Sequence, residues 1–129
     1  MSAGNVVTLR PNERVRQDAE PIATIYRNLG PTSAEQVVTR ALGELALTMA
    51  SLAAQVRDRD MQDLSRQLRR LQRMSENLGM VSLGLVAGDV RDCLDRADVT
   101  AFSAVWARLV RIAERSLAPD KGLLDQTFN

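Results

Sequence analysis

The sequence predicts an all-α fold, an antiparallel four-helix bundle that forms one domain. Apolar residues recur at helical spacing through residues 33–118, and the connections between these periodic segments are short. Aromatic residues make up only 3% of the chain, so the core must consist of Leu, Val, Ala and Met, which suit helices better than sheets. A chain of 129 residues is long enough to bury such a core without a second domain.

Residues 1–32 are predicted to form a polar N-terminal arm that is disordered or packs loosely on the bundle. They contain Pro11, Pro21 and Pro31 and have no sustained apolar period. Within the arm, the segment "IATIYRNLG" could form a turn or two of helix. Residues 119–129 are predicted to be a C-terminal tail, which leaves the bundle domain at residues 33–118.

The first predicted helix begins at Ser33, because Ser33 followed by Gln36 matches a capping box. A heptad seam on this helix ends near Val56 and consists of Val38, Leu42, Leu45, Met49, Leu52 and Val56. The charged residues 57–60 interrupt the seam and indicate a turn into a second, antiparallel helix. One continuous helix through both segments remains an alternative, since neither Gly nor Pro enforces the break.

The second predicted helix ends at Gly79, which has the position preferred for a left-handed C-cap. Its apolar stripe consists of Met61, Leu64, Leu68, Leu71 and Leu78. A third helix is predicted at about residues 81–96, where Gly84 and Gly88 would allow close contact with a neighbouring helix. It should bury Leu83, Val86, Val90 and either Cys93 or Leu94.

The fourth predicted helix follows the turn "RADVTAF", with Asp98 or Thr100 as its N-cap. It should end before Pro119, since proline disrupts a helix interior. Its predicted buried residues are Phe102, Val105, Leu109, Ile112 and Ala113.

The composition argues against an enzyme and against a metal or cofactor site. The sequence has no histidine and a single cysteine, Cys93, so it offers no Ser-His-Asp triad, Cys-His pair or histidine ligand. Asp89, Asp92 and Asp95 recur every three residues, a spacing that could hold a metal, yet solvated acids explain them more simply. We therefore expect no catalytic residue, no metal and no cofactor.

A net charge of +1 argues against nucleic-acid binding as the main role.

The hydropathy of the sequence indicates a cytoplasmic location without a membrane segment. The N-terminal residues lack the apolar core of a signal peptide, and the weakly charged stretch 77–88 is too short to span a bilayer.

Four arginines share one side of the second predicted helix, away from its leucine stripe. Arg66, Arg69, Arg70 and Arg73 have the spacing i, i+3, i+4 and i+7. Nearby acids offset only part of their mutual repulsion. Two interpretations stay open: a solvated face with Arg-acid pairs, or a docking surface for an acidic protein patch or a phosphate.

The segments "RRLQRMSENLG", residues 69–79, and "RADVTA", residues 96–101, resemble the histidine-containing phosphotransfer (HPt) family. The family motif is roughly H-x-L-K-G-x-x-x-N-L-G, followed by an apolar helix and an R-x-G-D turn, and the resemblance covers residues 69–117. The residues that match its first part are Leu71, Asn77, Leu78 and Gly79. The resemblance implies a four-helix bundle that meets receiver domains of two-component signalling.

Three departures from the motif remove the family's chemistry. Arg69 stands at the phospho-accepting histidine, Gln72 replaces the assisting lysine, and Arg73 replaces the glycine that lets the receiver approach. The resemblance therefore implies a non-catalytic protein that docks a response-regulator receiver domain or a histidine kinase. The predicted interaction surface consists of Arg66, Arg69, Arg70, Gln72, Arg73 and Glu76, with Asn77 and Gly79 as structural motif residues.

Two alternatives accompany this prediction. The first is a structural bundle that forms a homodimer through the seam of Val38 to Val56. The second, weaker one is a nucleic-acid-binding module that uses the arginine stripe and the basic arm.

Overall fold

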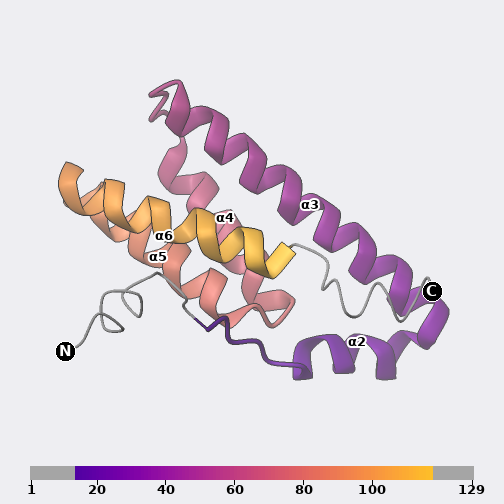
Figure 1. The fold of residues 1–129 in the computed structure, drawn as a ribbon. Coiled ribbons are helices and arrows are strands. Elements are labelled where there is room, and N and C mark those ends of the chain that lie inside the picture. Colours follow the sequence, from indigo (N-terminus) through magenta and orange to yellow (C-terminus); the bar gives the residue numbers. More distant parts are fainter. Residues whose placement is uncertain (1–13, 118–129) are drawn as a thin grey trace, which may run out of the picture.

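The computed structural model describes residues 14–117, which are all-helical and contain five helices and no strand (Figure 1). The helices are α2 (Glu20–Leu29), α3 (Pro31–Arg57), α4 (Leu64–Asn77), α5 (Val81–Asp95) and α6 (Val99–Leu117). Helices α3 to α6 correspond to the four predicted helices, and α2 is additional. The first 13 residues of the predicted arm and the predicted tail lie outside the described residues.

The helices pack mainly on their neighbours in the chain. Helix α4 packs against both α3 and α5, α5 packs against α6, and α3 makes only a minor contact with α6. Figure 1 shows α3 as the longest helix, with α2 crossing near its N-terminal end. As a result, one long side of α3 has no helix against it within the described part of the chain.

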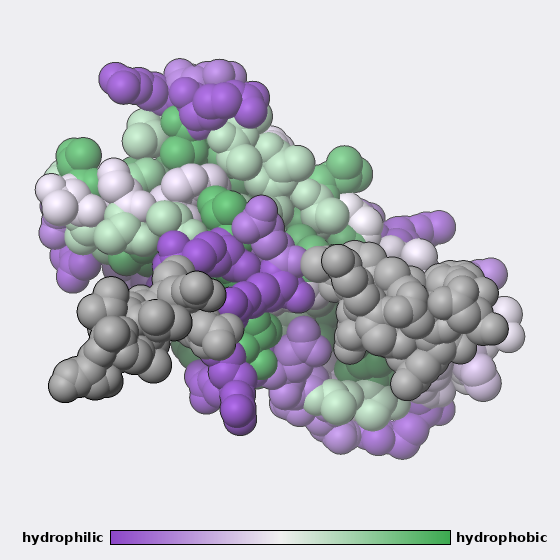
Figure 2. All heavy atoms as spheres, in the orientation of Figure 1, coloured by the Kyte–Doolittle hydropathy of each residue, from purple (hydrophilic) through white to green (hydrophobic). Residues whose placement is uncertain are grey.

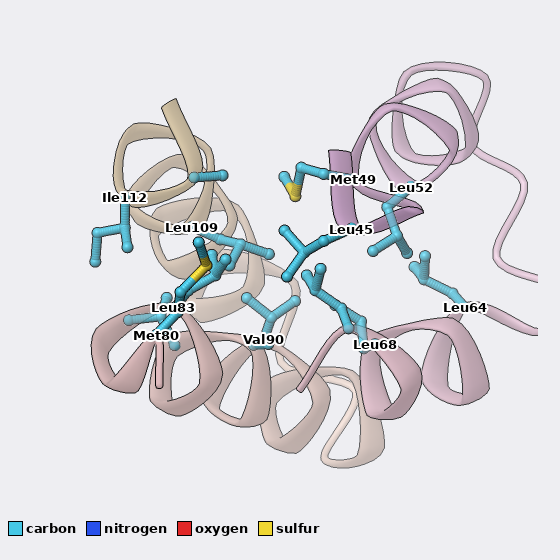
Figure 3. Close-up of a cluster of buried hydrophobic side chains, with 14 of the residues drawn as sticks. Leu45, Met49, Leu52, Leu64, Leu68, Met80, Leu83, Val90, Leu109 and Ile112 are labelled. Carbon is cyan, nitrogen blue, oxygen red and sulfur yellow. The ribbon is translucent and has the colours of Figure 1, made fainter. Parts of the chain in front are cut away.

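The core is an aliphatic cluster to which α3 to α6 all contribute, and Figure 3 shows its side chains converging between these helices. A fully buried leucine contributes about 1.5–3 kcal/mol to stability. Most predicted core residues are buried, while Val38, Leu42, Val56, Leu94 and Val105 are half-buried. Met61 is the exception, because α4 begins only at Leu64 and leaves Met61 in the preceding turn with 49% exposure.

The predicted arm is not disordered over residues 14–29, and the short helix expected in "IATIYRNLG" is present, although it buries no residue. Residues 20–29 form α2, and the segment before it pairs with the α4–α5 turn. The Arg16 amide donates to Ser82 Oγ at 2.7 Å, the Ser82 amide donates to the Arg16 carbonyl at 3.2 Å, and the Asp18 amide donates to the Gly79 carbonyl at 2.7 Å. Prolines lie in the first turns of α2 and α3, where a missing N–H costs no hydrogen bond, so they begin helices here.

The predicted capping box at Ser33 is also wrong. Helix α3 begins at Pro31, and Gly30, which has no side chain, is its N-cap. The predicted domain boundary at residue 33 consequently falls inside α3. The start of the last helix agrees with the prediction, because Asp98 Oδ1 accepts the Ala101 amide at 3.0 Å in an N-cap.

Helices α3 and α4 are separate, so the alternative of one continuous helix is wrong. Helix α3 ends at Arg57 in a Schellman motif, in which the Asp60 amide donates to the Gln55 carbonyl at 2.8 Å. Its left-handed residue is Arg59, with φ of 58°. Helix α5 ends in the same way, with Ala97 at φ of 55°. Both turns therefore use residues with a Cβ where glycine is usual.

Gly79 follows the end of α4 in the left-handed region, as the sequence predicts, with φ of 74°. Its amide donates to the Glu76 carbonyl at 3.1 Å, and the Met80 amide donates to the Ser75 carbonyl at 2.8 Å. A Cβ at this position would also overlap the carbonyl oxygen of Asp18. Glycine is thus required both by the backbone conformation and by the N-terminal segment that crosses the turn.

Helix α3 is also long and apolar enough to cross a membrane, judged by length and composition alone. The segment that meets this criterion is therefore α3 and not the weakly charged stretch 77–88. A core helix of a soluble bundle meets the same criterion, so this property assigns no location by itself.

Replacement of Gly79 by alanine should lower the free energy of unfolding by about 2–3 kcal/mol. The left-handed backbone accounts for about 1–2 kcal/mol of this loss, and the displaced hydrogen bond to Asp18 for about 1 kcal/mol. Urea unfolding followed by circular dichroism measures the change. Gly43→Ala is the matched control: Gly43 is exposed within α3 and no described atom lies within 4 Å of an added Cβ. The control should gain about 0.5–1 kcal/mol; equal effects of the two changes would contradict the role given to Gly79.

Candidate docking face on helix α4

The buried and the exposed side chains of α4 lie on opposite sides of the helix. Its buried side chains are Leu64, Leu68, Leu71 and Ser75. On the other side the structure exposes Arg66, Arg69, Arg70, Arg73 and Glu76. Ser75 is a core residue that the apolar pattern does not predict, because its side chain is polar. Its hydroxyl donates to the Leu71 carbonyl at 2.7 Å and is thereby satisfied.

Only one of the four arginines has an acidic partner among the described residues. Arg66 lies 3.2 Å from Asp63, and both side chains are more than half exposed, so the pair contributes little. Arg69, Arg70 and Arg73 form no ion pair within residues 14–117. The Arg-acid pairs of the first interpretation are therefore present at Arg66 alone, and the other three arginines are exposed to solvent.

Gln72 and Glu76 lie at the contact between α4 and α5. The Gln72 side chain is half-buried, and its Nε2 is 3.5 Å from Glu76 Oε2. A Cβ on Gly88 would lie 3.3 Å from Gln72 Nε2, and one on Gly84 would lie 3.4 Å from Glu76 Cγ. The two glycines thus allow the close helix contact that the sequence predicts. Gln72, which was predicted to be part of the interaction surface, thus packs against α5 beside Gly88.

The two predicted motif residues have different surroundings. Asn77 is the last residue of α4, and its side chain is exposed. Gly79 is buried in the turn beneath the N-terminal segment. Neither residue presents a side chain that could take part in chemistry with Arg69.

Arg66 and Arg69 border an open hollow of about 450 Å³ at the N-terminal end of α4. Its other walls come from the α3–α4 turn, which contributes Met61 and Asp63, and from the end of α5, which contributes Leu94 and Asp95. The sequence does not predict this hollow, because its residues come from distant segments that share no local pattern.

The chemistry of this face is mainly that of its guanidinium groups. Guanidinium groups form charge-assisted, often bidentate hydrogen bonds to carboxylates and phosphates, and they are not nucleophiles. Cys93 is buried in α5. Within the described range, no group of three or more His, Cys, Asp or Glu residues could hold a metal ion, and Asp89 instead lies 3.8 Å from Arg108.

Comparison of the chain with protein-family models, with curated proteins and with solved structures gave no match. The function must therefore be inferred from the residues and their geometry.

Replacement of Arg69 by glutamate should leave the fold intact and raise the free energy of unfolding by up to about 0.5 kcal/mol at low salt. The introduced carboxylate would face Arg66 and Arg73, one turn away on either side, in place of a third cation. Urea unfolding at low and at high salt measures the gain, which salt should remove. A loss of 1 kcal/mol or more would contradict the conclusion that Arg69 has no structural partner.

Proposed function

We propose that this protein is a non-catalytic docking module that binds a response-regulator receiver domain or a histidine kinase of two-component signalling through α4. In this proposal α3 to α6 form an HPt-like four-helix bundle to which α2 is added. The observation that carries the proposal is the set of three exposed arginines, Arg69, Arg70 and Arg73, which have no acidic partner among the described residues.

The energetics of α4 support a binding role for these arginines. Like charges at spacings of three and four destabilise an isolated helix by about 0.2–0.5 kcal/mol for each pair. An acidic partner would relieve this repulsion and add charge-assisted hydrogen bonds. Because buried leucines hold α4 in place, its arginines are presented on a rigid element, which limits the entropy lost on binding.

The resemblance supports the choice of partner. Arg69, at the position of the phospho-accepting histidine, is exposed near the middle of α4. A guanidinium there could pair with the carboxylates or the aspartyl phosphate of a receiver, but it cannot accept the phosphoryl group. The protein would then act as an adaptor or competitor in the cytoplasm, where receivers operate.

A nucleic-acid partner has less support. Base stacking requires exposed aromatic rings near the cationic face. Trp106 instead stacks on Phe102 within α6, with a centroid distance of 6.4 Å and an interplanar angle of 2°. Tyr26, which is exposed, lies on α2, which packs on α3 rather than beside the arginines.

Homo-oligomerisation is a second candidate function, favoured by the surface of α3. The predicted seam is not available for it, because Leu45, Met49 and Leu52 are buried in the core of the same chain. Other apolar residues of α3 are exposed, among them Leu47 at 73% and Val37 at 44%. Figure 2 shows hydrophobic residues along α3, bounded by a hydrophilic region at the α3–α4 turn.

The double change Arg69→Glu with Arg73→Glu should abolish binding of the partner while the helical circular dichroism spectrum stays unchanged. The test is a pull-down from lysate of the source organism, with retained proteins identified by mass spectrometry. Arg40→Glu on α3 is the matched control, since Arg40 is also exposed and has no ion pair within the described chain. We expect wild type and control to retain a receiver or a histidine kinase that the double variant loses.

Two results of this pull-down would contradict the proposal. One is the absence of receivers and histidine kinases from the proteins that the wild type retains. The other is their equal retention by the double variant, which would show that α4 does not bind them.

The second candidate is tested by the oligomeric state. If α3 mediates self-association, light scattering across a dilution series should show a dimer that dissociates on dilution, and Leu47→Glu should yield a monomer at every concentration. A wild-type monomer throughout the series would exclude this candidate. A dimer unaffected by Leu47→Glu would place the interface elsewhere.

A further inference from the structure

The N-terminal half of α3, residues 31–44, has little cover within the described part of the chain. Of these residues only Ala34 is buried, whereas the rest of α3 contributes Leu45, Met49 and Leu52 to the core. Helix α2 packs against α3, yet α2 itself buries no residue. Helices in proteins are stabilised mainly by packing of their apolar face, so this half of α3 is expected to have a further neighbour.

A hollow of about 370 Å³ opens on this half of α3. It is lined by Gln36, Val37, Arg40, Ala41 and Glu44, and we call it the α3 hollow. Val37 is 44% exposed, and Ala41 is half-buried. Among the described residues the lining comes from α3 alone, so neither α2 nor α6 fills the hollow.

Helix α6 ends near the α3 hollow. Its last residue, Leu117, packs on the same core cluster as Ala41 and Leu42. Figure 1 shows the end of α6 on the side of the bundle that faces α2 and the first half of α3. Residues 118–129 follow this end, and an extended chain of their length reaches about 40 Å. Because residues 31–44 of a helix span only about 20 Å, the segment after α6 can reach across the whole hollow.

The segment after α6 contains apolar side chains that could fill the α3 hollow. Leu123 and Leu124 are adjacent in the sequence, and Phe128 follows four residues later. Contact of the two leucines with Val37 and Ala41 would remove apolar surface of both segments from water.

The charges of the two segments are also complementary. Arg40 and Glu44 are exposed on α3 and form no ion pair within residues 14–117. Lys121 and Asp125 flank the two leucines with the same spacing of four residues. A segment that runs antiparallel to α3 would place Lys121 beside Glu44 and Asp125 beside Arg40. Such exposed pairs contribute little free energy, but they favour one direction and register of the segment.

We propose that residues 118–129 cover the α3 hollow of the same chain, with Leu123 and Leu124 against Val37 and Ala41. The covalent link to α6 favours this occupant over a second copy, because a short linker holds its segment at an effective concentration on the order of millimolar. The cover completes the burial of the first half of α3. This inference goes beyond the docking function of α4, and neither depends on the other.

The test measures how fast a thiol placed in the α3 hollow reacts with N-ethylmaleimide. Val37→Cys is made in the full chain, with and without the double change Leu123→Glu and Leu124→Glu. A cover that is closed about nine-tenths of the time slows the reaction about tenfold, so the double change should raise the rate of Val37→Cys by at least about that factor. Cys93 is buried and should react slowly in every variant.

Leu47→Cys is the matched control. Leu47 lies on the second half of α3, is 73% exposed and does not line the hollow. The control should react fast and at the same rate with the native and with the changed segment. Circular dichroism should show the same helical content in all variants, since the substituted positions are exposed or lie outside residues 14–117.

Equal rates for Val37→Cys with the native and with the changed segment would overturn the proposal. A slow rate that rises when the protein is diluted would also overturn it, because a second copy would then cover the hollow. Slow reaction at every concentration, lost with Leu123→Glu and Leu124→Glu, would support it.

Discussion

The close contact between α4 and α5 is the constraint on which the rest of the structure depends. Small residues lie on both sides of it: Gly84 and Gly88 on α5, and Ser75 on α4, whose Cβ would lie 3.6 Å from a Cβ on Gly84. The turn that joins the two helices closes on Gly79, whose left-handed backbone also receives the Asp18 amide. Once α4 is held in this way, its leucine stripe points into the core and its arginines must point outward.

The packing of α4 links the stability of the bundle to the exposure of the arginines on this helix. Burial of Leu64, Leu68 and Leu71 supplies the free energy that holds three or four neighbouring cations on one helix face. Since the described part of the chain neutralises only Arg66, the remaining charge is available to an anionic partner. The proposed docking function assigns this exposed positive charge to partner binding.

The two ends of the bundle differ in how they are closed. At the α4–α5 turn, the segment of Arg16 to Asp18 forms backbone and hydroxyl hydrogen bonds that cover the end. At the opposite end, the α3–α4 and α5–α6 turns contain left-handed, non-glycine residues and leave Met61 and Val99 exposed beside Arg66 and Arg69. The covered end accounts for part of the stability, whereas the open end exposes apolar side chains among groups of both charges, Arg66 and Arg69 with Asp63, Asp95 and Asp98.

The sequence by itself determined four helices with their buried stripes, a left-handed Gly79 just after α4, and an N-cap at Asp98 or Thr100, of which the structure uses Asp98. Each of these depends on residues within one or two turns, so helical periodicity, a positive φ or a capping side chain is enough to predict it. Only the tertiary structure decided that residues 16–29 join the fold, that Gln72 lies against Gly88, and that three arginines lack acidic partners among the described residues. It also decided that Met61, Leu94 and Val99 line one small hollow. These features arise from contacts between segments far apart in the chain, and such contacts leave no periodic pattern in the sequence.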